Sequence, residues 1–502
     1  MSNTRYFTVE GSSRTFDRNK LLAVMLFAFG LALLQVSAVN NLLPALESVK
    51  TGLGASDNDV QWVLSGYALA FGVILIPVGR FGDIFGRSGG FATGIALFAL
   101  ASLGCGLATD PLMLNIMRIF QGFSAGVFSP QVTALIQEYF EGKDRAWAFG
   151  IMGLVISASV AAGPVLSGLF VETIGWRWAF IINFPLGVVL FILALMWLPF
   201  GKERRTMGKK GRELAKREGI ERPPIDLDPL GNILIIVAVI CIMLPFMTHF
   251  VWRWALLIGG VLMIALWLAW ESHYKKIGRF PMVDLSLFRI PTYAFSTAVV
   301  ALLMLGSTSI FVVVAMFLQK GLGLSALETG LIGLPNALVA AYFSLWTGKR
   351  AFEKGAQIQF AALVAIATGA LASIPAAWAV VQGVTPWLMA APLALCGWGM
   401  GMIGSANQTQ AMLQIPPARA GTAGGVLQTS QRVTTAIGNA MVTAVLFIGR
   451  GTGDGHTPAE WFTGFTFAMI VISIALVASA TVAFIYMRKY PHAGPDLVSS
   501  PL

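Results

Sequence analysis

The stretch GRFGDIFGRSGG, residues 79–90, separates two long apolar runs with two arginines, one aspartate and five glycines. Apolar runs of about 18 or more residues recur along the whole chain, and each is long enough to cross a bilayer as a helix. The runs are continuous rather than alternating, which favours helices over the strands of a membrane barrel. Because helices satisfy their own backbone hydrogen bonds in lipid, the sequence predicts an all-α polytopic membrane protein.

The composition supports this class and argues against nucleic acid as a partner. The chain has 502 residues, of which 56% are hydrophobic and only 12% charged, about half the charged fraction of a soluble domain. The net charge of +10 is unevenly placed, because most Lys and Arg fall in alternate connections between the apolar runs. That distribution is the positive-inside bias of membrane proteins. Three cysteines in apolar runs indicate neither disulfides nor a metal site.

The hydropathy pattern predicts fourteen membrane spans. An even number of spans places both termini on one side, and the basic connections place that side in the cytoplasm. We therefore expect a multi-pass protein of the cytoplasmic (inner) membrane. The predicted spans are approximately 21–43, 58–79, 90–108, 112–137, 146–170, 179–199, 229–248, 251–270, 294–318, 327–348, 358–378, 386–413, 421–448 and 464–486.

The charged segment 201–228 divides the spans into groups of six, two and six. Paired six-helix halves are a known transporter plan, with the extra two helices as an insertion. The predicted parts are a cytoplasmic tail 1–20, a six-helix bundle 21–200, a cytoplasmic linker 201–228, a two-helix hairpin with its connection 229–293, a second six-helix bundle 294–487 and a cytoplasmic tail 488–502.

The opening stretch reverses the chain between the second and third spans. Glycines permit tight geometry and close helix approach there, and Asp83 can face a helix N-terminus or pair with a nearby arginine. These residues could latch two helical bundles together on the cytoplasmic side. The alternative is a basic turn that only obeys the positive-inside rule. The candidate latch residues are Gly79, Arg80, Gly82, Asp83, Gly86 and Arg87.

Several motifs resemble those of a known family. The opening stretch resembles the loop signature of the major facilitator superfamily. RIFQGFSAG (118–126) resembles its Arg-x-x-Gln-Gly motif, and GIMGLVISASVAAGPVLSG (150–168) resembles the Gly-Pro motif of its antiporters. GWRWAFIINFPLG (175–187) and PMVDLSLFRIPTY (281–293) are similar to signatures of its fourteen-helix drug:proton antiporter branch, the EmrB/QacA type. With the layout of six, two and six spans, the resemblance covers essentially the whole chain.

The resemblance implies two six-helix bundles around a central cavity that opens alternately to each side. It implies that Arg118, with Gln121 one turn later, takes part in proton transfer; the alternative is a structural arginine that pairs with helix carbonyls. It also implies that Gly163 and Pro164, with Gly168, form a hinge or seal, where proline would break the fifth helix locally. A fixed kink is the alternative there.

One position departs from the family pattern. In LQVSAVNNLLP (34–44), Gln35 stands where the branch carries an aspartate, and no Asp or Glu lies at a span centre. This departure puts proton coupling and a cationic substrate in doubt. A polar, uncharged lining remains, although each amide could instead hydrogen-bond between helices. The candidate coupling and cavity residues are Gln35, Asn40, Asn41, Arg118, Gln121, Gln428, Gln431 and Arg432, the last as a second buried cation.

Two functions follow as hypotheses. The first is a secondary active transporter that exports amphipathic drugs or hydrophobic metabolites with proton coupling. The second is a lipid or hydrophobic-metabolite transporter with atypical or no proton coupling. The sequence contains neither a catalytic constellation nor a soluble sensor domain. This argues against a third reading as a membrane enzyme or receptor. The chain has no phosphate-binding GxxxxGK[ST] loop. We expect a small amphipathic or lipid-like substrate, protons and the bilayer as partners, with no cofactor, no metal and no evident periplasmic adaptor.

Overall fold

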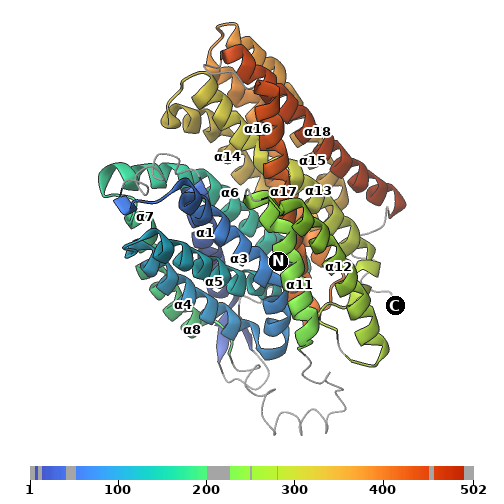
Figure 1. The fold of residues 1–502 in the computed structure, drawn as a ribbon. Coiled ribbons are helices and arrows are strands. Elements are labelled where there is room, and N and C mark those ends of the chain that lie inside the picture. The colour runs from blue at the N-terminus through green and yellow to red at the C-terminus, as the bar shows by residue number, and fades with distance from the viewer. Residues whose placement is uncertain are drawn as a thin grey trace, which may run out of the picture. The chain divides into compact units, whose positions relative to one another are not determined.

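The computed structural model describes residues 6–8, 14–40, 52–200, 227–248, 251–279, 281–451 and 457–490, and these are almost entirely helical (Figure 1). The exception is an antiparallel hairpin of β1 (Tyr6–Thr8) and β2 (Thr15–Asp17), in which Phe7 lies opposite Phe16. The chain 201–226 of the predicted linker and the tail after residue 490 lie outside the described residues.

In the part of the chain that the structure describes, fourteen long helices lie at the fourteen predicted spans, which confirms the all-α membrane fold. They are α1 (Arg18–Asn40), α3 (Asp57–Phe85), α4 (Arg87–Gly106), α5 (Pro111–Tyr139), α6 (Gly142–Thr173), α8 (Asn183–Trp197), α11 (Pro229–Met247), α12 (Arg253–Lys276), α13 (Pro291–Met316), α14 (Ala326–Gly348), α15 (Ala351–Val381), α16 (Ala390–Met412), α17 (Ala420–Arg450) and α18 (Pro458–Lys489). Short helical turns join some of them: α7 (Trp178–Ile181), η1 (Leu285–Arg289), η2 (Phe317–Gly321), η3 (Pro386–Met389) and η4 (Pro417–Arg419).

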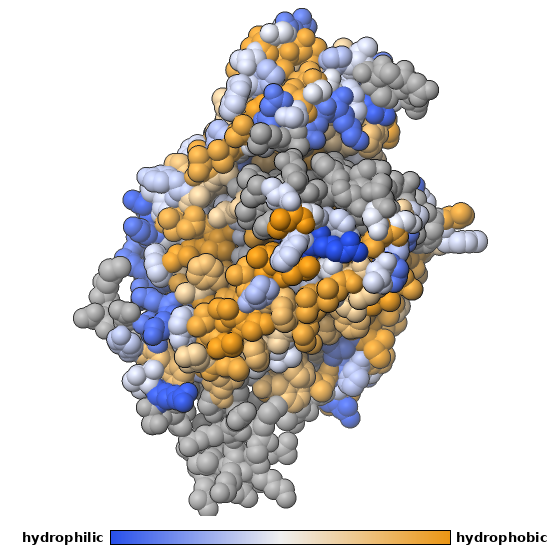
Figure 2. Space-filling view, turned by 90° about the vertical axis from the view of Figure 1, so that its left-hand side faces the viewer, coloured by the Kyte–Doolittle hydropathy of each residue, from blue (hydrophilic) through white to orange (hydrophobic). Residues whose placement is uncertain are grey.

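Within the described residues, twelve helical segments are long and apolar enough to cross a membrane. The two long helices outside that set, α5 and α6, have 29 and 32 residues, and α5 carries Asn115, Arg118 and Gln121 along its length. Hydrophobic side chains cover much of the face shown in Figure 2. This exposed apolar surface is what contact with lipid tails requires.

Local sequence signals decide where several helices begin. In α3, α14 and α18, a Ser or Thr at the N-cap accepts a hydrogen bond from the backbone of the third helical residue, and the acid at that position binds back to the N-cap backbone. This capping box satisfies backbone N–H groups that have no partner within the helix. The pairs are Ser56 with Asp59, Ser325 with Glu328, and Thr457 with Glu460.

Close helix packing depends on small residues, as at the GxxxG spacings from Gly122 to Gly126 and from Gly397 to Gly401. A Cβ atom at Gly122 of α5 would lie 2.2 Å from the carbonyl oxygen of Tyr67 in α3. Likewise, a Cβ atom at Gly397 of α16 would lie 2.2 Å from the carbonyl oxygen of Asn336 in α14. The missing side chains let backbones meet directly, a common means of helix association in membranes.

The chain forms two compact units. Unit one comprises Met1–Tyr139, Leu166–Leu287 and Ile415–Thr429, and unit two comprises Phe140–Val165, Phe288–Gln414 and Ser430–Leu502. The inserted helices α11 and α12 belong to unit one. Helices α6 and α17 each begin in one unit and end in the other. The division into bundles 21–200 and 294–487 stays a prediction, because these units assign parts of α6 and α17 differently.

Helix α6 runs without interruption through Gly163, Pro164 and Gly168. The local break that the sequence predicts at Gly163-Pro164 is therefore not an end or gap in the helix. A proline removes only one backbone hydrogen bond, and long membrane helices tolerate this loss. The side chain of Pro164 lies outside the described residues.

Candidate functional site

The stretch 79–90 forms a sharp reversal between α3 and α4. Gly86 ends α3 and begins α4 with φ 117° and ψ 131°, a conformation that side-chain-bearing residues rarely adopt. Gly79 allows a close approach, because a Cβ atom there would lie 2.3 Å from the carbonyl oxygen of Gly421. Gly82 faces the side chain of Gln131 in α5. The backbone geometry thus favours glycine at Gly79 and Gly86, which agrees with the tight turn expected from the sequence.

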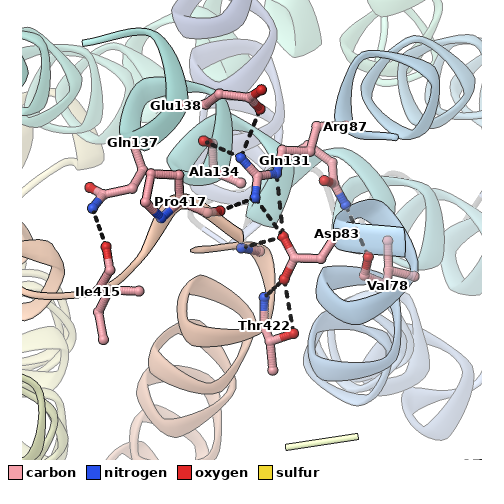
Figure 3. A network of polar contacts seen from close by, with 11 residues as sticks. Val78, Asp83, Arg87, Gln131, Ala134, Gln137, Glu138, Ile415, Pro417 and Thr422 are labelled. Carbon is pink, nitrogen blue, oxygen red and sulfur yellow. Dashed lines mark hydrogen bonds and ion pairs between the residues drawn. The ribbon is translucent and has the colours of Figure 1, made fainter. Parts of the chain in front are cut away.

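Asp83 binds the start of α17 (Figure 3). Its Oδ1 accepts a hydrogen bond of 2.9 Å from the backbone N–H of Gly421. Its Oδ2 accepts from the backbone N–H and the hydroxyl of Thr422, at 2.8 and 3.0 Å. The first N–H groups of a helix have no intrahelical partner and carry partial positive charge, so a carboxylate is favoured there. Asp83 therefore caps α17 from a different helix.

Arg87 joins the same network and is buried. Its guanidinium lies 2.8 Å from a carboxylate oxygen of Asp83 and 2.8 Å from one of Glu138 in α5. It also donates to the carbonyl of Ala134 at 3.2 Å and to the carbonyl of Pro417. A buried cation must be paired and fully hydrogen-bonded to be tolerated. Arg87 meets this condition through two acids and two carbonyls.

Two glutamines and one arginine lie beside the network of Asp83 and Arg87. Gln137 of α5 donates to the carbonyl of Ile415 at 2.8 Å, and Gln131 donates to the carbonyl of Val78 at 3.0 Å. Arg80 lies half-buried at the end of α3. We call Asp83, Arg87, Glu138, Gln137 and the segment 415–422, which leads into α17, the latch; all of it belongs to unit one.

Sequence reasoning missed several latch residues. Glu138, Gln137 and Thr422 are not among the candidate residues that the sequence indicates. The available signal for Glu138 was its place at the end of the fourth span. The basic turn 79–90 supplies cations on the same side of the membrane. Thr422 had no signal, because nothing in the sequence shows that α17 begins beside Asp83.

A second polar cluster surrounds Arg118, which is 1% exposed. Its Nε donates to the carbonyl of Val63 in α3 at 2.8 Å, and its Nη1 donates to Oε1 of Gln121 at 2.6 Å. The guanidinium lies 4.5 Å from the ring centroid of Tyr67, where the aromatic face attracts a cation. Gln121 in turn donates to the hydroxyl of Ser102 in α4 at 2.6 Å. The predicted neighbourhood of Arg118 and Gln121 is thus present.

Arg118 has no acidic partner in the part of the chain that the structure describes. The ion pairs found there involve other cations. The positive charge is held by a carbonyl, an amide oxygen and an aromatic face instead. A buried cation without a carboxylate carries a large desolvation cost, which makes Arg118 a functional candidate rather than a simple packing residue.

Gln35 is buried in α1 and is bound to α8. Its Oε1 accepts a hydrogen bond of 2.6 Å from Asn183 Nδ2, which also lies 3.1 Å from the carbonyl of Ala179. Among the described residues, Gln35 therefore pairs with Asn183 and not with Arg118. Asn183 was quoted within the motif 175–187, but its side chain was not singled out. The side chain of Asn40 and the whole of Asn41 lie outside the described residues.

The remaining candidates lie on α17. Gln428 accepts a hydrogen bond of 2.6 Å from the hydroxyl of Ser129 in α5, the interhelical bond that is the alternative to a cavity lining. Gln431 and Arg432 are half-buried and belong to unit two. The role of Arg432 as a second cation within a span stays a prediction.

Comparisons with known proteins agree on one family. The family model for the Major Facilitator Superfamily matches residues 22–439. The chain is 31% identical over 495 residues to the puromycin resistance protein pur8 of Streptomyces alboniger, covering 95% of this chain and 93% of that protein. It is 30% identical over 436 residues to a probable actinorhodin transporter of Streptomyces coelicolor, covering 85% of this chain and 72% of that protein.

A solved structure supports the same fold. The human organic anion transporter MFSD10 superimposes with a TM-score of 0.63 at 14% sequence identity, covering 93% of this chain and 99% of that chain. At this low identity the similarity concerns the fold alone.

Proposed function

Because this chain belongs to the Major Facilitator Superfamily, we propose that it is a secondary active transporter that exports amphipathic drugs or hydrophobic metabolites by alternating access. Membership makes the chain a multi-pass membrane transporter and not an enzyme. The names of its relatives, which concern puromycin resistance and actinorhodin transport, support drug export. The basic connections support an orientation with the latch and both termini in the cytoplasm.

The observation that carries the mechanism is the binding of Asp83 to the start of α17. Helix α17 continues from unit one into unit two after Thr429. Holding its first turn on α3 therefore restrains one of the segments through which the chain passes between the two units. In the proposed cycle the latch closes the cytoplasmic side, and its release lets the cavity open there.

Helix α6 is the second helix that begins in one unit and ends in the other. The boundary falls between Val165 and Leu166, one residue after Pro164. A helix lacking one backbone hydrogen bond bends there at the lowest cost. We assign Gly163, Pro164 and Gly168 the role of a hinge or seal on this basis.

For the coupling step, we place Arg118 and Gln121 at its centre. Arg118 itself keeps its charge, so its proposed role is to act electrostatically on a proton that moves along the route; its buried guanidinium contacts Gln121 and the ring of Tyr67. The second candidate function, a lipid or hydrophobic-metabolite transporter with atypical or no proton coupling, is favoured by Gln35, which accepts a hydrogen bond from Asn183 and cannot titrate.

Transport in everted membrane vesicles distinguishes the two candidates. The experiment measures accumulation of an amphipathic dye and of a fluorescent lipid analogue, each with and without a protonophore. Dye accumulation that collapses with the protonophore supports proton-coupled export. Lipid-analogue transport that persists with the protonophore supports the second function. Absence of both activities in vesicles containing inserted protein would contradict export of this substrate class.

We expect the Gln35→Asp variant to make transport more dependent on pH than in the natural protein. The new carboxyl group occupies a buried position beside Asn183, where a change in its protonation alters the local charge. The measurement is the initial transport rate from mildly acidic to mildly basic pH. Gln35→Asn is the matched control, because it has the same length without the titratable group. Identical pH profiles for the two variants would show that position 35 does not control coupling.

A further inference from the structure

A carboxylate in the connection between α12 and α13 binds cations from two separate parts of unit one. Lys275 Nζ lies 2.8 Å from Oδ1 of Asp284, and Arg419 Nη1 lies 3.0 Å from Oδ2. The backbone N–H of Ser286 also donates to Oδ1, at 3.0 Å. Oδ1 of Asp284 is thus bound by α12 and by the backbone of the connection itself, and Oδ2 is bound by the segment before α17.

Arg419 ends η4 and directly precedes the first residue of α17. The neighbouring backbone is bound by the latch: the carbonyl of Pro417 accepts from Arg87, and the carbonyl of Ile415 accepts from Gln137 at 2.8 Å. The short segment 415–422 is therefore held both by the latch helices α3 to α5 and by the connection that follows the inserted helices.

The Asp284 carboxylate stays ionised at physiological pH. Burial alone would raise its pKa, but the hydrogen bonds from Lys275 and Ser286 and the charge of Arg419 lower the pKa from 3.8 to about 2. A group whose pKa is lowered on folding stabilises the folded state at pH values above its ordinary pKa. That stabilisation is lost only as the pH falls toward the lowered pKa. The side chain is 17% exposed, so water screens the pairs incompletely.

We propose that Asp284 is a positioning residue for transport: it fixes Arg419 and thereby holds the first N–H groups of α17 toward Asp83. The connection that follows the inserted pair α11 and α12, which pack side by side (Figure 1), would then brace the latch. Helix α11 also packs against α3, the helix that carries Asp83. The role in transport rests on the proposed latch, whereas the positioning of α17 can be measured without substrate.

The experiment measures how readily the first turn of α17 leaves its site. Ala420 is fully buried there, so Ala420→Cys introduces a thiol that reacts with a maleimide only when this turn moves out. Cys241 is replaced by Ala to remove a half-buried competitor. We expect Asp284→Asn and Arg419→Gln each to raise the alkylation rate about two- to fivefold, the range expected for breaking a partly exposed ion pair.

Three further variants make the test specific. Lys275→Gln removes the other cation from the same carboxylate, and its side chain is about as exposed as that of Arg419; its alkylation rate should stay unchanged. Asp284→Glu should restore the slow rate. The double variant Asp284→Asn with Arg419→Gln should react no faster than either single variant, because both remove the same pair. An unchanged rate in both single variants, or an equal rise in Lys275→Gln, would overturn the proposal.

Transport assays separate this proposal from the proposed function. We expect Asp284→Asn to lower the maximal transport rate about two- to fivefold without changing the substrate concentration at half-maximal rate, since Asp284 acts on the latch and not on substrate. Faster alkylation with unchanged transport would refute the role in transport. If the natural protein exports none of the substrates tested, the alkylation result still decides whether Asp284 positions α17.

Discussion

We expect the Asp83→Asn variant to lose nearly all export activity while it inserts into the membrane at a normal level. Both carboxylate oxygens of Asp83 accept hydrogen bonds, from Gly421 and Arg87 on one oxygen and from Thr422 on the other. An asparagine must turn an NH₂ group toward one of these sets of donors, and it leaves the buried Arg87 with one acid instead of two. Breaking a buried pair in this way costs about 3–5 kcal/mol, enough to shift a conformational equilibrium about a hundredfold or more.

The measurement is transport into everted vesicles, normalised to the amount of inserted protein. Asp59→Asn is the matched control, because it makes the same chemical change in the same helix, at the exposed capping box of α3. That variant should transport at close to the natural rate. Normal transport by well-inserted Asp83→Asn protein would refute the latch.

The second large effect is expected at Arg118. We predict that Arg118→Met lowers transport at least about tenfold, equivalent to about 1.4 kcal/mol or more, while the thermal stability of the purified protein is maintained or raised. Arg118 carries a buried charge with no carboxylate partner among the described residues, and replacing such a charge by an apolar side chain often does not destabilise a protein. A merely structural arginine predicts the opposite result, a lower melting temperature.

Two measurements on one preparation decide between these outcomes: the melting temperature in detergent and the transport rate after reconstitution. Gln121→Leu serves as the companion variant, because it removes the 2.6 Å hydrogen bond to Arg118 but leaves the charge in place. We expect it to lower transport less than Arg118→Met does. Full transport by Arg118→Met, or loss of transport explained by unfolding alone, would exclude a coupling role for this arginine.

The position of the helices follows from the sequence alone. Each apolar run must form a helix in lipid, because no water is present to bind its backbone groups. This constraint is local, so the spans, the reversal at Gly86 and the pairing of Arg118 with Gln121 one turn later could all be predicted. The packing role of the GxxxG spacings follows from the same local logic, since glycine is where two backbones can meet.

The partners across the fold were decided only by tertiary structure. Asp83 binds Gly421 from 338 residues away, Gln35 binds Asn183, and Asp284 binds Arg419. Hydropathy shows that a helix crosses the membrane, but lipid accepts any apolar face equally well. Which helices become neighbours depends on the fit of their surfaces. A polar side chain at a helix end therefore finds its partner only after that fit has placed the other helix beside it.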